Sequence, residues 1–172
     1  MDEQQLKKYW FFSWAGCFGV NRQNAREALK SLEYIATELP QKAGRSLWMF
    51  PQGEITPQEA RPLGFHSGLA YLIRRLGNCY VYPVSLRYEF MREQYPDIFV
   101  SVGPALHFEA GQKIQLKGLT TTLEQTLIHD LATLREDVSQ QRLDNFVTIL
   151  RGKGSTDTSL DAFFKLFKKS KI

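Results

Sequence analysis

The stretch best suited to chemistry is Phe50-Pro51-Gln52-Gly53-Glu54, which follows a mostly apolar segment that begins at residue 46. The apolar segment predicts a short buried strand, and the Pro-Gly corner predicts a loop whose backbone turns freely. Such a loop presents polar side chains at a strand end, which is where ligands bind in open α/β sheets. Gln52 and Glu54 are therefore the first candidates for contact with a ligand.

The residues after this loop predict the elements that hold it. Five apolar residues at helical spacing predict one face of a helix that ends at Gly77. They are Phe65, Leu69, Leu72, Ile73 and Leu76. The apolar run from Cys79 to Tyr88 predicts a second strand. Strand, loop, helix and strand form a βαβ unit with a right-handed crossover. We therefore expect an α/β domain with a central, largely parallel or mixed sheet flanked by helices.

Capping signals predict two further helices. Asn24 and Glu27 form a capping-box pattern before an amphipathic segment that ends near Pro40 and Gly44. Thr121 and Glu124 repeat the pattern before a long amphipathic segment that reaches Val138. Between these helices, residues 98–102 predict a third strand closed by Gly-Pro.

Composition limits the class of protein. The chain has 172 residues, 43% of them hydrophobic and 23% charged, which are ordinary values for one globular domain. Cys17 and Cys79 lie in apolar sequence without metal-ligand spacing, which predicts buried, reduced thiols and no metal site. No stretch approaches the roughly 20 apolar residues of a membrane-spanning helix. Most of the net charge of +4 lies after Gly152, which argues against a nucleic-acid-binding surface.

The two ends of the chain carry apolar segments. Residues 9–20 resemble a signal peptide, but the apolar run is short and aromatic, with Trp14 where a small aliphatic residue is expected. Two interpretations stay open for it: a helix packed on the sheet, or a patch that faces a membrane. We expect residues 1–150 to form the α/β domain, residues 151–159 a linker and residues 160–172 a basic amphipathic helix. That helix either lies on an anionic membrane surface or docks on its own domain.

Phe50-Pro51-Gln52-Gly53-Glu54 resembles the Phe-Pro-Glu-Gly-Thr-Arg-Ser block of the glycerol-phosphate and lysophospholipid acyltransferase family. Three other stretches resemble further blocks of that family, in the right order: Gly16 to Arg22, Phe65-His66-Ser67-Gly68 and Val81-Tyr82-Pro83-Val84. The resemblance implies transfer of a fatty acyl group from a coenzyme A or acyl carrier protein thioester to a lipid hydroxyl. It also implies a substrate site that includes Arg22, Phe50, Pro51, Gln52, Gly53, Glu54, Arg61, His66 and Pro83.

The sequence departs from the family in two places. The family's catalytic His is followed five positions later by Asp, and none of His66, His107 and His129 has that partner. We therefore expect an N-terminally shortened form that lacks this catalytic block. In the third block the family's Glu, Thr and Arg are replaced by Gln52, Glu54 and Ile55.

Several residues could replace the missing groups. Glu54 could supply the carboxylate lost at Gln52, and Arg61 could supply the lost positive charge beside Arg22. His66 could act as an acid or base, although a capping or solvent-facing role is the simpler interpretation, and His129 is interpreted as structural.

The resemblance therefore predicts an acyltransferase of phospholipid or related lipid synthesis, and the missing catalytic block leaves open whether this form is active. We expect no bound cofactor and a thioester co-substrate. We expect a cytoplasmic protein, peripheral at the inner face of a membrane, that binds no nucleic acid. The alternative is a non-catalytic module on the same fold that binds lipid or docks on a membrane. The sequence leaves the acyl chain, the acceptor headgroup and the oligomeric state open.

Overall fold

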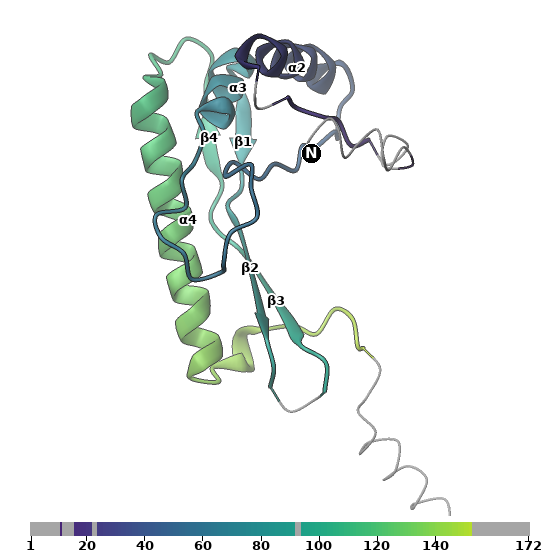
Figure 1. The fold of residues 1–172 in the computed structure, drawn as a ribbon, viewed down its shortest axis with the longest axis vertical. Coiled ribbons are helices and arrows are strands. Elements are labelled where there is room, and N and C mark those ends of the chain that lie inside the picture. Colours follow the sequence, from purple (N-terminus) through teal and green to yellow (C-terminus); the bar gives the residue numbers. More distant parts are fainter. Residues whose placement is uncertain (1–10, 12–15, 22–23, 92–93, 153–172) are drawn as a thin grey trace, which may run out of the picture. The chain divides into compact units, whose positions relative to one another are not determined.

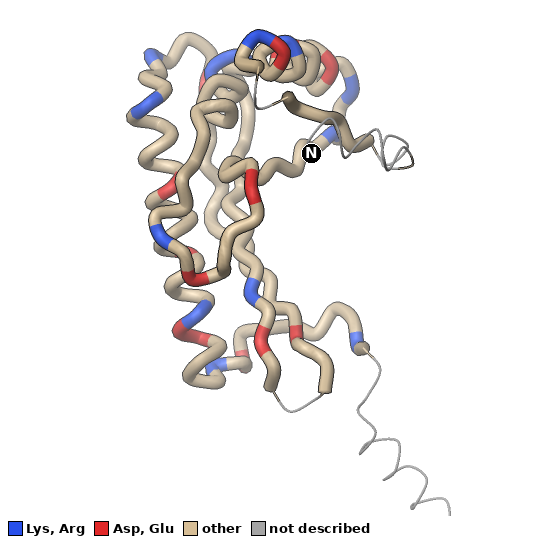
Figure 2. Tube along the Cα trace, in the orientation of Figure 1, with Lys and Arg blue, Asp and Glu red and all other residues tan. Residues whose placement is uncertain are grey.

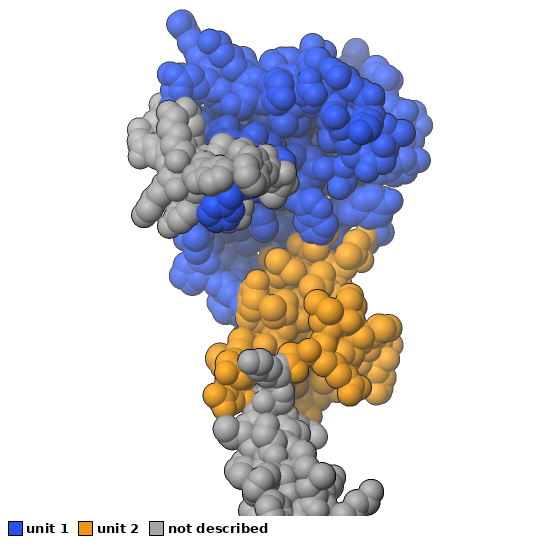
Figure 3. Space-filling view, turned by 90° about the vertical axis from the view of Figure 1, so that its right-hand side faces the viewer, with its two compact units in different colours: residues 1–83, 104–128 blue, residues 84–103, 129–172 orange. Residues whose placement is uncertain are grey.

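The computed structural model describes residues 11, 16–21, 24–91 and 94–152 (Figure 1). In chain order the elements are α2 (Ala25–Glu38), η2 (Leu39–Gln41), α3 (Gly68–Leu76), β1 (Cys79–Val81), β2 (Val84–Glu89), β3 (Asp97–Val102), β4 (Leu106–Phe108), α4 (Leu116–Ser139) and η3 (Leu143–Asn145). They belong to two compact units, which Figure 3 colours separately. Unit 1 comprises residues 1–83 and 104–128, and unit 2 comprises residues 84–103 and 129–172.

The described strands form two antiparallel pairs. In unit 1, β1 pairs with β4, and in unit 2, β2 pairs with β3. The mixed α/β class is confirmed, but the expected central sheet is wrong for these residues, because each of their two sheets has only two strands and neither is parallel. Residues 46–50 are assigned no strand, so the predicted βαβ unit does not form.

The single strand predicted from Cys79 to Tyr88 is divided into β1 and β2. The break falls at Tyr82 and Pro83, where proline lacks the N–H group that would continue a ladder. The third predicted strand is confirmed as β3, one residue longer than expected at its start.

Helix α2 begins where its sequence predicts. The Asn24 side chain accepts hydrogen bonds from the backbone N–H groups of Arg26 (3.0 Å) and Glu27 (3.4 Å). These bonds satisfy two of the N–H groups that a helix start leaves without intrahelical partners. The helix ends at Glu38, before the short turn η2 that contains Pro40.

Helix α3 packs against α2 in unit 1. Leu72 and Ile73 of the predicted apolar face are buried, together with Ala70, and Gly77 ends the helix with a φ of 73°. A side chain at Gly68 would meet Leu32 of α2 and Met49 at ordinary contact distances. The start of α3 therefore lies close to both α2 and the segment before the candidate loop.

A polar cluster also joins α2 to α3. The carboxylate of Glu33 accepts a hydrogen bond from the Tyr71 hydroxyl and a second, of 2.9 Å, from Nε of Arg75. The bond from Tyr71, followed by the bond from Arg75, lowers the pKa of Glu33 below its ordinary value of 4.5. The bond to Glu33 also raises the pKa of Tyr71.

This cluster predicts a pH-dependent part of the stability. Because the folded-state pKa of Glu33 is lowered, its stabilisation is complete above the ordinary carboxyl pKa and is lost as the pH falls through the lowered value. We expect Glu33→Gln to lower the Tm at pH 7 and to lower it progressively less below about pH 4.5. Thermal unfolding of both proteins over pH 3–7 measures this. An equal difference at every pH would contradict a charged Glu33 as the stabilising group.

Helix α4 starts earlier than expected, at Leu116 rather than near Thr121. The predicted capping box is wrong because the Thr121 hydroxyl donates to the carbonyl oxygen of Lys117 within the helix. Thr120 and Thr122 donate in the same way to residues four positions before them. These bonds satisfy hydroxyl groups that would otherwise favour a cap. The apolar face is confirmed, since Leu123, Leu134 and Val138 are buried.

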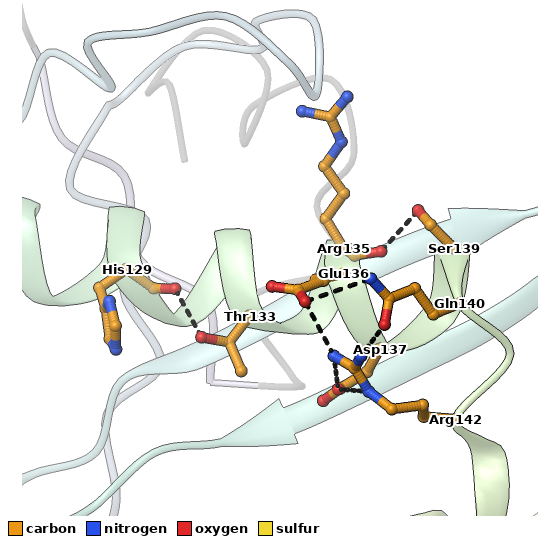
Figure 4. Close-up of polar contacts among 8 residues, drawn as sticks. All are labelled: His129, Thr133, Arg135, Glu136, Asp137, Ser139, Gln140 and Arg142. Carbon is orange, nitrogen blue, oxygen red and sulfur yellow. Dashed lines mark hydrogen bonds and ion pairs between the residues drawn. The ribbon is translucent and has the colours of Figure 1, made fainter.

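The end of α4 is closed by backbone and side-chain bonds in unit 2 (Figure 4). Arg142 N–H donates to the Asp137 carbonyl oxygen (2.8 Å) and Gln141 N–H to that of Val138 (3.1 Å), the two bonds of a Schellman motif. Gln141 has a φ of 54°, the left-handed conformation this motif requires. The Arg142 guanidinium forms ion pairs with Asp137 and Glu136. The hydrogen bond to Asp137 is the main cause that raises the pKa of Arg142.

The two cysteines differ from their predicted state. Both are free, but Cys17 is exposed, so the prediction of a buried thiol is wrong there. The residues from Gly16 to Gly19 form a turn and an irregular segment rather than part of a packed helix or strand. Cys79 is half-buried at the start of β1, and burial raises the pKa of its thiol.

Several sequence predictions fall on residues that the structure does not describe. They are Arg22, half of the aromatic stretch 9–20, and all of the predicted linker and terminal helix after Gly152. Within the described part of the chain, no helix is both long and apolar enough to cross a membrane. Figure 2 shows Lys and Arg interspersed with Asp and Glu along α2 and α4.

Candidate functional site

The candidate loop contains a tight turn from Phe50 to Gly53. The N–H of Gly53 donates to the carbonyl oxygen of Phe50 at 3.0 Å, which closes a four-residue β-turn. Pro51 occupies the second position, where its fixed φ favours such turns. Gly53 has a φ of 68°, a conformation that residues with a Cβ adopt at a cost. The predicted role of the Pro-Gly corner in reversing the chain is thus visible in the backbone.

A hydrogen bond joins this turn to the start of α3. The N–H of His66 donates to the carbonyl oxygen of Pro51 at 3.0 Å. The bond brings the Phe-Pro-Gln-Gly-Glu stretch beside Phe65-His66-Ser67-Gly68, although ten residues of loop separate them. Two of the sequence blocks that suggested a site therefore lie together in unit 1.

The side chains of the turn differ in exposure. Phe50 is 74% exposed, Gln52 is half-buried and Glu54 is exposed. Nε2 of Gln52 donates to the Thr56 hydroxyl at 3.0 Å, so Thr56 fixes the Gln52 amide. The nearby apolar residues Trp48 and Ile55 are also exposed, at 74% and 104%.

Arg61 lies in the loop between the turn and α3. Its guanidinium donates to the carbonyl oxygens of Gln58 (3.0 Å) and Ala60 (2.7 Å) of the same loop. These bonds hold the loop, and a phosphate bound by Arg61 would have to share the guanidinium with them. Further along, the N–H of Gly64 donates to Oε1 of Glu124 on α4 at 2.7 Å. The loop is therefore fastened at both ends.

The remaining predicted site residues are His66, Pro83 and Arg22. His66 is exposed immediately before α3, and Pro83 is half-buried between β1 and β2. The bond from the His66 backbone to Pro51 is the contact that places His66 at the turn. Arg22 lies outside the described residues, so its position relative to the turn is a prediction. Among the described residues, no cluster of His, Cys, Asp or Glu could hold a metal ion.

Sequence reasoning missed two residues that shape the loop, Thr56 and Glu124. Thr56 lies four positions after Gln52, but nothing in the sequence marks it as a partner. Glu124 was predicted to cap its own helix, whereas it binds the backbone of Gly64, 60 residues earlier. A contact of such long range leaves no local pattern that could have revealed it.

The model of the Acyltransferase family matches residues 7–87, which include the turn, α2, α3 and β1. Over these residues the chain is similar to the glycerol-phosphate/lysophospholipid acyltransferase family, and the resemblance seen in the motifs is confirmed. No curated protein and no solved structure matches the chain significantly.

Proposed function

We propose that the chain binds a fatty acyl thioester and a lipid alcohol at the Phe50–Glu54 turn and transfers the acyl group to the alcohol. The observation that carries this proposal is the bond from His66 N–H to the Pro51 carbonyl oxygen, which joins two acyltransferase-like stretches in one place. The family match over residues 7–87 supports acyl transfer as the general reaction.

The turn offers suitable surroundings for both substrates. Trp48, Phe50 and Ile55 expose apolar surface on which an acyl chain can lie. Glu54 provides a carboxylate at the rim of that surface, where it can accept the proton of an approaching hydroxyl group. The hydroxyl oxygen attacks the thioester carbonyl carbon, the C–S bond breaks, and the thiolate takes up the proton, so the reaction balances without another reactant.

The acceptor is proposed to be a lipid hydroxyl of a phospholipid or a related lipid. Because Ile55 stands where the family has an arginine, the loop lacks one positive charge for an acceptor phosphate. A lipid acceptor resides in a bilayer, so we propose that the protein works at the cytoplasmic surface of a membrane. The donor is a thioester of coenzyme A or of an acyl carrier protein.

A lipid-binding module without catalysis is the second candidate function. It is favoured by the sequence, because none of the three histidines has an Asp five positions later. Both candidates require the apolar surface at the turn, but only catalysis requires the carboxylate of Glu54. The two candidates therefore differ in the effect of removing that carboxylate.

We expect Glu54→Ala to lower acyl transfer by at least about tenfold, because the group that accepts the hydroxyl proton is lost. The measurement is transfer from a radiolabelled acyl-coenzyme A to a mixture of lysophospholipids and neutral lipid alcohols. Asp144→Ala removes an exposed carboxylate outside the turn and serves as the control. Unchanged transfer by Glu54→Ala would remove Glu54 from the site, and thioester binding without transfer by the unaltered chain would favour the lipid-binding module.

A further inference from the structure

One face of the β2–β3 hairpin is lined entirely by apolar side chains. The register places Val84 opposite Val102, Leu86 opposite Val100 and Tyr88 opposite Ile98. Residues that are directly opposite on antiparallel strands point to the same face. We call these six residues the hairpin apolar face. Tyr88, Ile98 and Val102 on it are 55%, 60% and 61% exposed.

The other face of the hairpin is already packed. Ser85 is 1% exposed, and Phe99 makes an edge-to-face contact with Phe146, with ring centroids 5.5 Å apart. An antiparallel sheet with one packed face ordinarily carries polar residues on the face that meets water. Four of its six residues are exposed, including Val100 at 46%, and exposed apolar patches of a few hundred Å² are the largest that typical monomers carry. It therefore has the character of a docking surface.

The C-terminal segment of the same chain has a complementary sequence. Its residues 160–172 carry apolar side chains at helical spacing on one side: Leu160, Phe163, Phe164 and Phe167. A helix of this length spans about 20 Å, and a six-residue strand also spans about 20 Å. The apolar stripe of the segment and the hairpin apolar face therefore match in length and in chemistry.

The connection between them is short and begins at the hairpin. Phe146 contacts Phe99 of β3, and Leu160 follows 14 positions later. An extended connection of that length reaches about 45 Å, which exceeds the length of the hairpin. A short tether gives an effective concentration in the millimolar range, far above that of a second copy at micromolar protein. Tethering thus favours this segment over a dimer partner.

We propose that residues 160–172 dock on the hairpin apolar face in aqueous solution, with the Leu/Phe side of the segment against the sheet. The docking covers two apolar surfaces that would otherwise both face water. The inference is independent of the reaction proposed for the turn.

Hydrogen exchange of the full chain, without lipid, tests this docking. We expect Phe163→Ser/Phe167→Ser to accelerate exchange of the β2 and β3 amides by about tenfold, because removing the packed segment eases local opening. Ile98→Ser on the hairpin is expected to accelerate exchange of the amides of residues 160–172. Leu150→Ser, at a position that is 88% exposed, is the matched control and is expected to leave both unchanged. Circular dichroism of each variant confirms that the domain is folded.

Three results would overturn the proposal. Exchange of the hairpin amides that is equal in Phe163→Ser/Phe167→Ser and in the control would show that the segment does not cover them. Protection that rises with protein concentration, together with a dimeric mass in light scattering, would assign the face to a second copy. Protection that arises only when phosphatidylglycerol vesicles are added would assign it to a membrane.

Discussion

Gly53→Ala is expected to weaken the binding of an acyl thioester by about tenfold or more, because the turn at residues 50–53 can no longer hold its conformation. Gly53 has a φ of 68°, and a residue with a Cβ pays roughly 1–2 kcal/mol in this region. The strain is relieved by opening the turn, which moves Gln52 and Glu54. Titration of the protein with a non-hydrolysable acyl-coenzyme A analogue measures the loss.

Gly111→Ala is the matched control for this variant. Gly111 also has a positive φ, of 86°, and a Cβ there would meet nothing within 4 Å. The backbone penalty is therefore similar, but the strained residue lies in another turn of unit 1. Equal losses of binding in Gly53→Ala and Gly111→Ala would mean that general destabilisation, and not the turn, causes the effect.

The largest expected loss of stability comes from Ile73→Ala. Ile73 is 1% exposed on the face of α3 that forms the core of unit 1. Truncation of a fully buried isoleucine removes its transfer free energy and leaves a cavity, at a cost of about 2–5 kcal/mol. Chemical denaturation measures the free energy of unfolding. Ile55→Ala is the control, since Ile55 is fully exposed and its truncation is expected to cost less than about 0.5 kcal/mol.

A loss in Ile73→Ala no greater than that in Ile55→Ala would contradict the packing of α3 in unit 1. Because Ile73 does not lie in the turn, this experiment tests the scaffold separately from the site. A destabilised scaffold with an intact turn would still bind the thioester below the unfolding transition.

The helices were the predictable part of the fold. Their signals are local: Asn24 caps α2 with its own side chain, and the apolar spacing around Ile73 recurs every turn of α3. Gly77 ends α3 for a reason that is also local, its positive φ. Capping and periodicity act within a few residues, so a single sequence is sufficient to reveal them.

The sheets were not predictable in the same way. The apolar stretch at residues 46–50 satisfies the pattern of a buried strand, but a strand also requires a partner strand, which the local sequence does not identify. Pro83 divides the next strand, and the antiparallel partners of β1 and β2 come from later in the chain. The long-range bond between Gly64 and Glu124 escaped prediction for the same reason.

The part of the candidate site that could be predicted is the part that depends on adjacent residues. The turn at Gly53 follows from Pro51 and glycine themselves, whereas the meeting of this turn with His66 depends on the path of the intervening loop. The contributions of Glu54, Arg61 and Pro83 to substrate binding are predictions for the experiments above.

The central claim is that the Phe50–Glu54 turn contacts an acyl thioester. Its most direct test is photolabelling of the full chain with a coenzyme A thioester whose acyl chain carries a diazirine, followed by mass spectrometry of the labelled peptides. The proposed site predicts labels on residues 48–56 and 61–68 that excess unlabelled acyl-coenzyme A displaces. Labels that are confined to other residues, or that excess acyl-coenzyme A does not displace, would contradict it.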